Sequence, residues 1–364
     1  MLDRENLDAV LLNAQHNFAW LTGGGSNGVD LSRENGVASL LITRGGDRYL
    51  FASMIEIDRM LDEELSEEDF APIDYSWEGE KADPGLVIEK ARSLLETGAA
   101  LATDIPLDSS APAVEGIIAA CRHELTGFEV ERYRELGRDA GEAAQRVIDR
   151  AMPGQTELEV AADFRNELAR YNINSVVTLA AGDERIAKYR HPVPTINRWR
   201  DSLLIVTCAK RGGLIASLSR IICAGEIPDE LRSTTEAAAS VNARLMSATL
   251  PGTTGAELYE TAAKAYADQG FATQIHLHHQ GGATGYKTRD WVAHPQSKEI
   301  VKMNQAFAWN PSITGTKVEE TGIVTHDGFE VITATADFPQ VTVSIDGTDF
   351  HSPGILSLAK GAAA

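Results

Sequence analysis

A segment that occurs twice in the C-terminal part of the chain restricts the fold most strongly. PGQTELEVAADFRNELARY begins at Pro153, and PGTTGAELYETAAKAYADQGF begins at Pro251, 98 residues later. Each copy has a Pro-Gly step, a threonine, a helical pattern and then a β-rich run, and a long helical stretch precedes each copy. Thr156 and Glu159 form the pattern of a capping box, which fixes the start of the first repeated helix. The duplication predicts a pseudo-twofold domain with a curved sheet, helices on its outside and a ligand cleft between its halves.

The residues before the repeat follow an alternating pattern instead. Helical and β-rich segments take turns, and a Gly-Gly turn joins two β-rich runs into a hairpin over residues 37–53. This alternation predicts an α/β domain. Near residue 127 the pattern changes to a long helical stretch, and a chain of 364 residues is long for one core. We therefore expect two domains, residues 1–127 and 128–364.

The charge balance limits the partners of this chain. It has 53 acidic and 33 basic residues, and a formal net charge of −20 would repel a phosphate backbone and an anionic lipid surface alike. We expect neither nucleic acid nor a membrane as partner. The first residues, MLDRENLDAVLL, carry acids where a signal peptide is basic, and no window approaches the roughly 20 apolar residues of a spanning helix. These features favour a cytoplasmic location.

Two motifs have a plain structural interpretation. The loop GGGSNG, Gly23 to Gly28, formally fits a dinucleotide fingerprint and a nucleophile elbow, but the residues before it are helical in pattern where both motifs need a strand. We interpret it as a flexible loop that can border a binding site. Three cysteines without close spacing are expected to be free thiols. One of them, Cys208, lies in an apolar hairpin over residues 203–225 and is expected to be a buried, inert thiol rather than a nucleophile.

Three of the nine histidines lie within four positions in the segment HLHHQGG. If residues 274–279 form a strand, His276 and His278 lie on one face and His279 on the other. At most two of them could then bind one metal ion, which would need a third ligand and usually a carboxylate. The alternative is that they are surface or hydrogen-bonded histidines. The two glycines that follow allow a close approach of the backbone, which favours His279 as the histidine that faces the cleft.

Two further segments carry candidate functional residues. His191 stands in YRHPVPT, where the Pro-x-Pro sequence holds it in a stiff extended loop that is useful for positioning a base. Glu319 and Glu320 begin a strand-like run, and adjacent residues on a strand point to opposite faces. Only one of these two carboxylates is therefore expected to face the cleft.

Taken in order, these segments resemble the creatinase and aminopeptidase P family, which has the pita-bread fold and includes methionine aminopeptidases and prolidases. The resemblance covers the whole chain. It implies a creatinase-like N-terminal α/β domain followed by a pita-bread catalytic domain with a mainly antiparallel curved sheet. In the metallopeptidases of this family, two aspartates, one histidine and two glutamates hold two metal ions.

The aspartate positions of the family do not carry aspartate in this chain. Arg220 in LSRII fits an arginine of the family pattern, which puts Ser217 at the second aspartate position. The first aspartate position falls on Val206, or on Thr207 if the register moves by one. Both positions therefore lack the carboxylate that would bridge the metal ions.

Of the remaining three ligand positions, two match. His279 fits the histidine and Glu319 the second glutamate, whereas Asn310 stands at the first glutamate. Two divalent ions without three of their carboxylates would have an incomplete shell and uncompensated charge. We therefore expect the dinuclear metal site to be absent.

Creatinase resembles this chain because it keeps the fold but has lost the aspartates that bind metal ions. It too has a cysteine just after the first aspartate position. Creatinase-like enzymes hydrolyse a C–N bond with a histidine in a His-Asn-Pro loop as proton shuttle, and His191 takes that place by resemblance. An imidazole with a pKa near 6.5 can take a proton from water and pass it to the leaving nitrogen. Creatine itself is not expected as substrate, because Ser219 and Asn310 replace the carboxylates that hold it.

The first hypothesis is a metal-independent, creatinase-like hydrolase of a C–N bond in a small nitrogen-containing substrate, with no cofactor. In place of a metal ion, hydrogen-bond donors would polarise the carbonyl. The expected catalytic residues are His191, His279 and Glu319. The expected substrate-binding residues are Asn310, Arg289, Ser217 and Tyr286.

Two alternatives stay open. One is an Xaa-Pro aminopeptidase-like or dipeptidase-like metallopeptidase with a single divalent ion near His279 and Glu319, completed by His191 or His276. The other is an inactive family member that binds a peptide or metabolite. The resemblance also implies a homodimer in which the partner's N-terminal domain closes the cleft, with the loop from Gly23 to Gly28 as the candidate edge.

Overall fold

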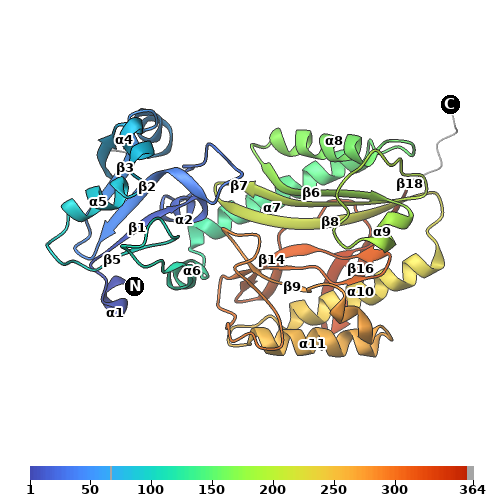
Figure 1. The fold of residues 1–364 in the computed structure, drawn as a ribbon. Coiled ribbons are helices and arrows are strands. Elements are labelled where there is room, and N and C mark those ends of the chain that lie inside the picture. The colour runs from blue at the N-terminus through green and yellow to red at the C-terminus, as the bar shows by residue number, and fades with distance from the viewer. Residues whose placement is uncertain (66–67, 359–364) are drawn as a thin grey trace. The chain divides into compact units, whose positions relative to one another are not determined.

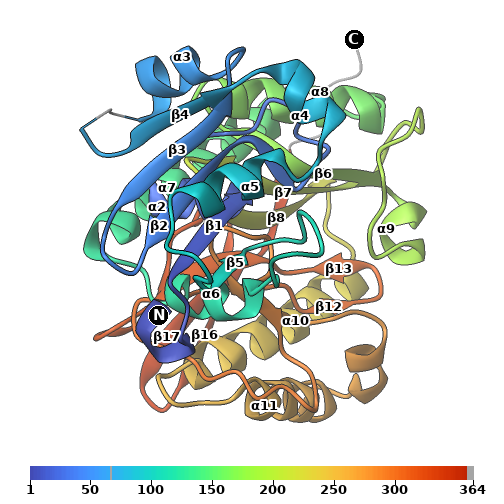
Figure 2. The same ribbon diagram turned by 60° about the vertical axis from the view of Figure 1, so that its left-hand side comes forward.

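The computed structural model describes residues 1–65 and 68–358, and the chain divides into two compact units, Met1–Arg122 and His123–Ala364. The first unit contains a five-stranded sheet in the order β4-β3-β2-β1-β5, whose strands lie side by side in Figure 2. The predicted hairpin is confirmed as β2 and β3. The strands are β1 (Ala9–Ala14), β2 (Asn35–Thr43), β3 (Arg48–Ser53), β4 (Ala71–Tyr75) and β5 (Leu101–Thr103).

Helices of the first unit cover both faces of this sheet. Along β1, Val10 packs in one apolar cluster with Phe18, whereas Leu11 packs in another with Ile88. Successive residues of a strand point to opposite faces, so the continuous apolar run of β1 reflects burial on both sides. The loop from Gly23 to Gly28 has no regular structure. The helices are α1 (Leu2–Glu5), α2 (Gln15–Leu21), α3 (Ile57–Arg59), the π-helix η1 (Met60–Glu64), α4 (Trp77–Ala82), α5 (Leu86–Ser93) and α6 (Glu115–Arg122).

The second unit contains the predicted duplication. Its repeated helices, α8 (Glu157–Ala169) and α11 (Gly255–Asp268), both start with a capping box, which confirms the prediction for Thr156 and shows the same device at Thr254. In each box the threonine hydroxyl accepts a hydrogen bond from the amide three residues on, and the glutamate there accepts one in return. A long helix precedes each copy. These are α7 (Gly127–Ile148) and α10 (Asp229–Ala248).

Two mainly antiparallel sheets lie between the helix pairs of this unit (Figure 1). A four-stranded sheet has the order β18-β8-β7-β6, and a five-stranded sheet has the order β10-β9-β11-β14-β15. A β-bridge between Ser219 and Glu319 joins them. The strands are β6 (Asn174–Gly182), β7 (Ser202–Arg211), β8 (Leu214–Ala224), β9 (Gly281–Thr284), β10 (Trp291–Val292), β11 (Ala306–Trp309), β14 (Glu320–Thr325), β15 (Gly328–Val331) and β18 (Ile355–Leu358).

Short elements complete the second unit. Two small hairpins pair β12 with β13 and β16 with β17. Within the described residues, no helix is long and apolar enough to cross a membrane. The remaining elements are α9 (Glu184–Lys188), the 3-10 helix η2 (Ala272–His276), β12 (Ser312–Ile313), β13 (Thr316–Lys317), β16 (Gln340–Ile345) and β17 (Thr348–Pro353).

The prediction of a strand over residues 274–279 is wrong. Residues 272–276 form η2, the next residues are irregular, and β9 begins only at Gly281. The reason is the length of the partner strand, because β11 ends at Trp309, the residue that pairs with Gly281. Gly281 has a φ of 105°, and a Cβ there would lie 2.1 Å from the carbonyl oxygen of Ala308. The glycine therefore permits close approach to a neighbouring strand.

Candidate functional site

A cavity of about 340 Å3 lies between the two halves of the second unit. It combines an apolar wall with charged and imidazole side chains. The first half contributes β6, β7 and the loop after α9, and the second half contributes the segments around β9, β11 and β13. The lining residues are Val177, Leu179, His191, Val206, Cys208, His279, Thr288, Arg289, Asn310, Lys317 and Glu319.

Glu319 lies at the buried base of this cavity, between two cations. Its Oε2 atom is 3.4 Å from Nζ of Lys317, and its Oε1 atom is 3.7 Å from Nη2 of Arg289. Ser219 donates a hydrogen bond to Oε2. Burial opposes ionisation, but the charges of Lys317 and Arg289 outweigh it and hold the pKa of Glu319 below its ordinary value. The base of the cavity therefore has two positive charges and one negative charge.

Two polar groups at this base are left for a ligand. Asn310 is buried and directs its Nδ2 atom to Oε1 of Glu319 at 3.5 Å. Its Oδ1 atom has no hydrogen-bond partner among the described residues, and the same holds for the buried Nε of Arg289. Buried polar atoms are rarely left unpaired, so this acceptor and this donor are available to a polar ligand or a water molecule.

The opposite wall is apolar and contains a thiol. Cys208 accepts a hydrogen bond from Ser217 Oγ at 3.2 Å, and burial raises the pKa of the Cys208 thiol. All three cysteines are free thiols, as predicted. Ser217 is the buried partner of Cys208 on the adjacent strand β8 and does not line the cavity. Tyr286 lies apart from the cavity, where its hydroxyl donates a hydrogen bond to Glu129 at 2.7 Å.

Three histidines gather beside the cavity. The Nε2 atoms of His191 and His278 are 3.1 Å apart, and the rings of His278 and His279 stack with centroids 4.4 Å apart. One nitrogen from each of the three rings lies within 4.8 Å of the others. The predicted separation of His278 and His279 on opposite strand faces is wrong, because this segment is not a strand. His276, at the end of η2, is exposed and outside the cluster.

The environment favours the neutral form of all three imidazoles. Burial and the charge of Lys317 lower the pKa of His278 to about 2. Burial and Arg289 lower the pKa of His279 to about 4, and burial, followed by Lys317, also lowers the pKa of His191. A neutral imidazole offers a nitrogen lone pair, which is what a proton acceptor or a metal ligand requires.

The residues do not fit a carboxylate-bridged pair of metal ions. Val206 and Ser217 offer no carboxylate, and the Asn310 amide is neutral. Glu319 is the carboxylate of this cavity, and Lys317 and Arg289 already compensate its charge. Two divalent ions at this place would add four positive charges beside two cations.

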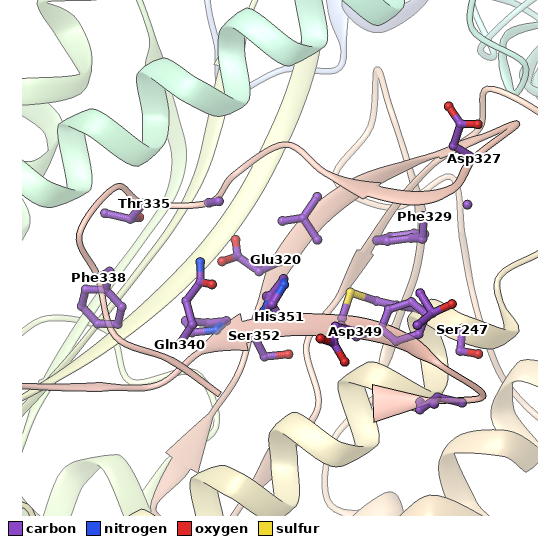
Figure 3. Close-up of a pocket in the computed structure, with 18 of the residues that line it drawn as sticks. Ser247, Glu320, Asp327, Phe329, Thr335, Phe338, Gln340, Asp349, His351 and Ser352 are labelled. Carbon is purple, nitrogen blue, oxygen red and sulfur yellow. The ribbon is translucent and has the colours of Figure 1, made fainter. Parts of the chain in front are cut away.

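The same unit has a second cavity, of about 500 Å3, which contains the side chain of Glu320, the residue next to Glu319 (Figure 3). Glu320 lines it and forms an ion pair with Arg220 at 2.9 Å, and Thr333 donates a hydrogen bond to the same carboxylate. The prediction that Glu319 and Glu320 face opposite sides is confirmed. Because the buried charges of this second cavity are paired with each other, we regard it as structural support for the sheet.

The duplicated fold with a polar cavity between its halves defines a pita-bread hydrolase. Residues 131–332 match the model of metallopeptidase family M24, and this chain belongs to that family. The fold and family predicted from the sequence are confirmed.

Individual relatives are distant in sequence. An Xaa-Pro dipeptidase from Lactobacillus delbrueckii subsp. lactis is 24% identical over 248 residues, which are 65% of this chain and 67% of the relative. Among solved structures, a prolidase from Pyrococcus furiosus has a TM-score of 0.75 at 19% identity and covers 92% of this chain and 98% of its own. A dipeptidase from Pyrococcus horikoshii OT3 has a TM-score of 0.78 at 16% identity and covers 98% of both chains. At this identity the solved structures show the fold alone.

Proposed function

We propose that this protein hydrolyses the C–N bond of a small, dipeptide-like substrate that carries a carboxylate group. The observation that carries the proposal is the base of the cavity, where Lys317 and Arg289 flank the single carboxylate of Glu319. An anionic group would compensate the excess positive charge there, and the free Nε of Arg289 could donate to it.

The size and the apolar wall of the cavity support a substrate of this class. A volume of about 340 Å3 is at the small end of ligand pockets. Val177, Leu179 and Val206 form a wall that suits a compact apolar side chain or ring. The similarity to Xaa-Pro dipeptidases supports dipeptides with a C-terminal proline as the first substrates to test.

Two ways of activating water are compatible with these side chains. In the first, His191 takes a proton from water and returns it to the leaving nitrogen, while His279 and Asn310 contact the carbonyl oxygen. In the second, one divalent ion near His279 and Glu319 would supply a Lewis acid. The similarity to Xaa-Pro dipeptidases supports the second over the metal-independent alternative.

A panel of matched substrates tests the proposal. We expect Xaa-Pro dipeptides to be hydrolysed, and we expect their C-terminal amides, which lack the carboxylate, to show a KM about tenfold higher or more. Arg289→Gln should raise KM for the acids and leave KM for the amides unchanged. Binding without turnover would replace the proposal by a peptide-binding or metabolite-binding role. Equal KM values for acids and amides would show that the base of the cavity does not bind the carboxylate.

A further inference from the structure

We propose that His191, His278 and His279 form a site for one divalent transition-metal ion beside the cavity. Metal binding at this site does not depend on the proposed function. Only a catalytic role of the bound ion rests on that function. The site differs from the carboxylate-bridged pair of ions that the family pattern implies, because its ligands are three imidazoles and two of them lie outside the matched ligand positions.

The spacing of the nitrogen atoms suits one ion. Zinc–nitrogen bonds of about 2.0–2.1 Å in a tetrahedral site place two donor atoms about 3.4 Å apart. The Nε2 atoms of His191 and His278 are already 3.1 Å apart, and the third ring has a nitrogen within 4.8 Å of both. A change of side-chain torsion at His279, which is exposed, would close the remaining distance.

Contacts outside the cluster hold the two contributing segments together. The Nη2 atom of Arg190, next to His191, donates to Gln274 Oε1 at 2.7 Å and to Thr314 Oγ1 at 3.0 Å. Gln274 lies in η2 and also accepts from the Thr314 amide at 3.0 Å. The prolines after His191 restrict that loop further. The site is therefore positioned by side chains that are not themselves ligands.

The contact between His191 and His278 is one that a single ion could use. The Nε2 atom of His278 lies 3.1 Å from the Nε2 atom of His191. Two neutral imidazoles can share only one proton there. A metal ion would use both lone pairs at once.

The donor set indicates the kind of metal. Three imidazoles and an open fourth position are typical of catalytic zinc, whereas Mg2+ and Ca2+ prefer oxygen ligands. Lys317 and Arg289 repel a cation, and Glu319 offsets only part of that charge. We therefore expect weaker binding than in a closed structural zinc site, and Lys317→Met should strengthen it. When bound, the ion would supply a Lewis acid to the substrate in the cavity.

Metal titration of the protein, after it has been stripped with a chelator, tests the site without any substrate. We expect one Zn2+ per chain by calorimetry, and Co2+ should give the visible absorption of a tetrahedral nitrogen site. His191→Ala, His278→Ala and His279→Ala should each lower affinity by about tenfold or more. His276→Ala is the matched control, since His276 is exposed and outside the cluster. Circular dichroism, with His278→Asn as a second variant, separates loss of ligand from loss of fold.

The outcomes distinguish this site from the proposed function. Equal affinities for His276→Ala and His278→Ala, two ions per chain, or undetectable binding would each overturn the site. Tight binding of one ion without hydrolysis of any dipeptide would retain the site and overturn the proposed function. Hydrolysis that persists in chelated protein without Zn2+ affinity would retain the function, with His191 as proton carrier, and overturn the site.

Discussion

The Nε2 atoms of His191 and His278 lie 3.1 Å apart, although 87 positions separate the two residues in the sequence. One histidine follows α9 in the first half of the duplicated unit, and the other follows η2 in the second half. The contact therefore depends on how the halves face each other. It places two imidazoles beside the cavity. The charged residues at the base of that cavity come from other segments of the chain.

Stability at low pH should depend on Glu115. Burial opposes its ionisation, but hydrogen bonds from His16 and Asn17 and the charge of Arg122 outweigh it and lower the pKa of Glu115 to about 2. A lowered pKa stabilises the fold above the ordinary value of 4.5 and loses this effect as pH falls toward 2. Since the side chain is partly exposed, we expect only about 1–2 kcal/mol.

Urea unfolding of the wild type and of Glu115→Gln at pH 7 and pH 3 measures this contribution. The difference between the two proteins should be about 1–2 kcal/mol at pH 7 and smaller at pH 3. A difference that does not change with pH would show that the charge of Glu115 has no role in stability.

Gly281→Ala should be strongly destabilising, because it combines two effects. The residue has a φ of 105°, and a Cβ would lie 2.1 Å from the carbonyl oxygen of Ala308. Gly252→Ala is the control, since Gly252 has a φ of 97° but open space around it. We expect about 1 kcal/mol for Gly252→Ala and more than about 3 kcal/mol for Gly281→Ala in thermal or urea unfolding. Similar losses would mean that β9 moves freely away from β11.

Glu319→Gln should destabilise the protein by about 2–4 kcal/mol, because it leaves Lys317 and Arg289 without their carboxylate. Glu330→Gln provides the comparison, since its partner Arg134 is at the surface and such pairs contribute at most about 1 kcal/mol. Denaturant titration gives both values. If the loss in Glu319→Gln falls when acetate or another small carboxylate is added, the cavity binds anions. A loss no larger than that of Glu330→Gln would contradict the buried charge arrangement.

The two repeated helices should lose equal stability when their caps are removed. Thr156→Ala and Thr254→Ala each delete a hydroxyl that accepts a hydrogen bond from an amide in the first turn. We expect about 1 kcal/mol for each, measured by urea unfolding. Serine in place of either threonine should retain most of the stability. A loss at only one site would show that the halves differ in how their helices are held.

Local patterns predicted the parts of this protein that depend on local contacts. The capping box at Thr156 follows from residues within one helical turn, and the opposite orientations of Glu319 and Glu320 follow from the period of a strand. Lys317 was missed as a cavity residue, although the same period puts it on the side of Glu319. The separation of two positions between Lys317 and Glu319 could have identified Lys317 as a cavity residue.

Other features depend on distant partners and could not be predicted locally. Residues 274–279 are rich in histidine and were expected to be a strand, but β11 ends where it pairs with Gly281, so the ladder cannot include them. Tyr286 was expected at the site and instead bonds to Glu129 of α7. In both cases the deciding contact comes from a segment more than twenty residues away in the chain.

The opposite orientations of Glu319 and Glu320 make this segment sensitive to length as well as to composition. Each carboxylate compensates a different set of cations, Lys317 and Arg289 on one side and Arg220 on the other. Deleting Val318 would move the register by one residue and exchange the two sides. Both sets of cations would then lose their counter-charge in one event. An insertion or deletion in this segment would therefore have to be matched by a second change elsewhere.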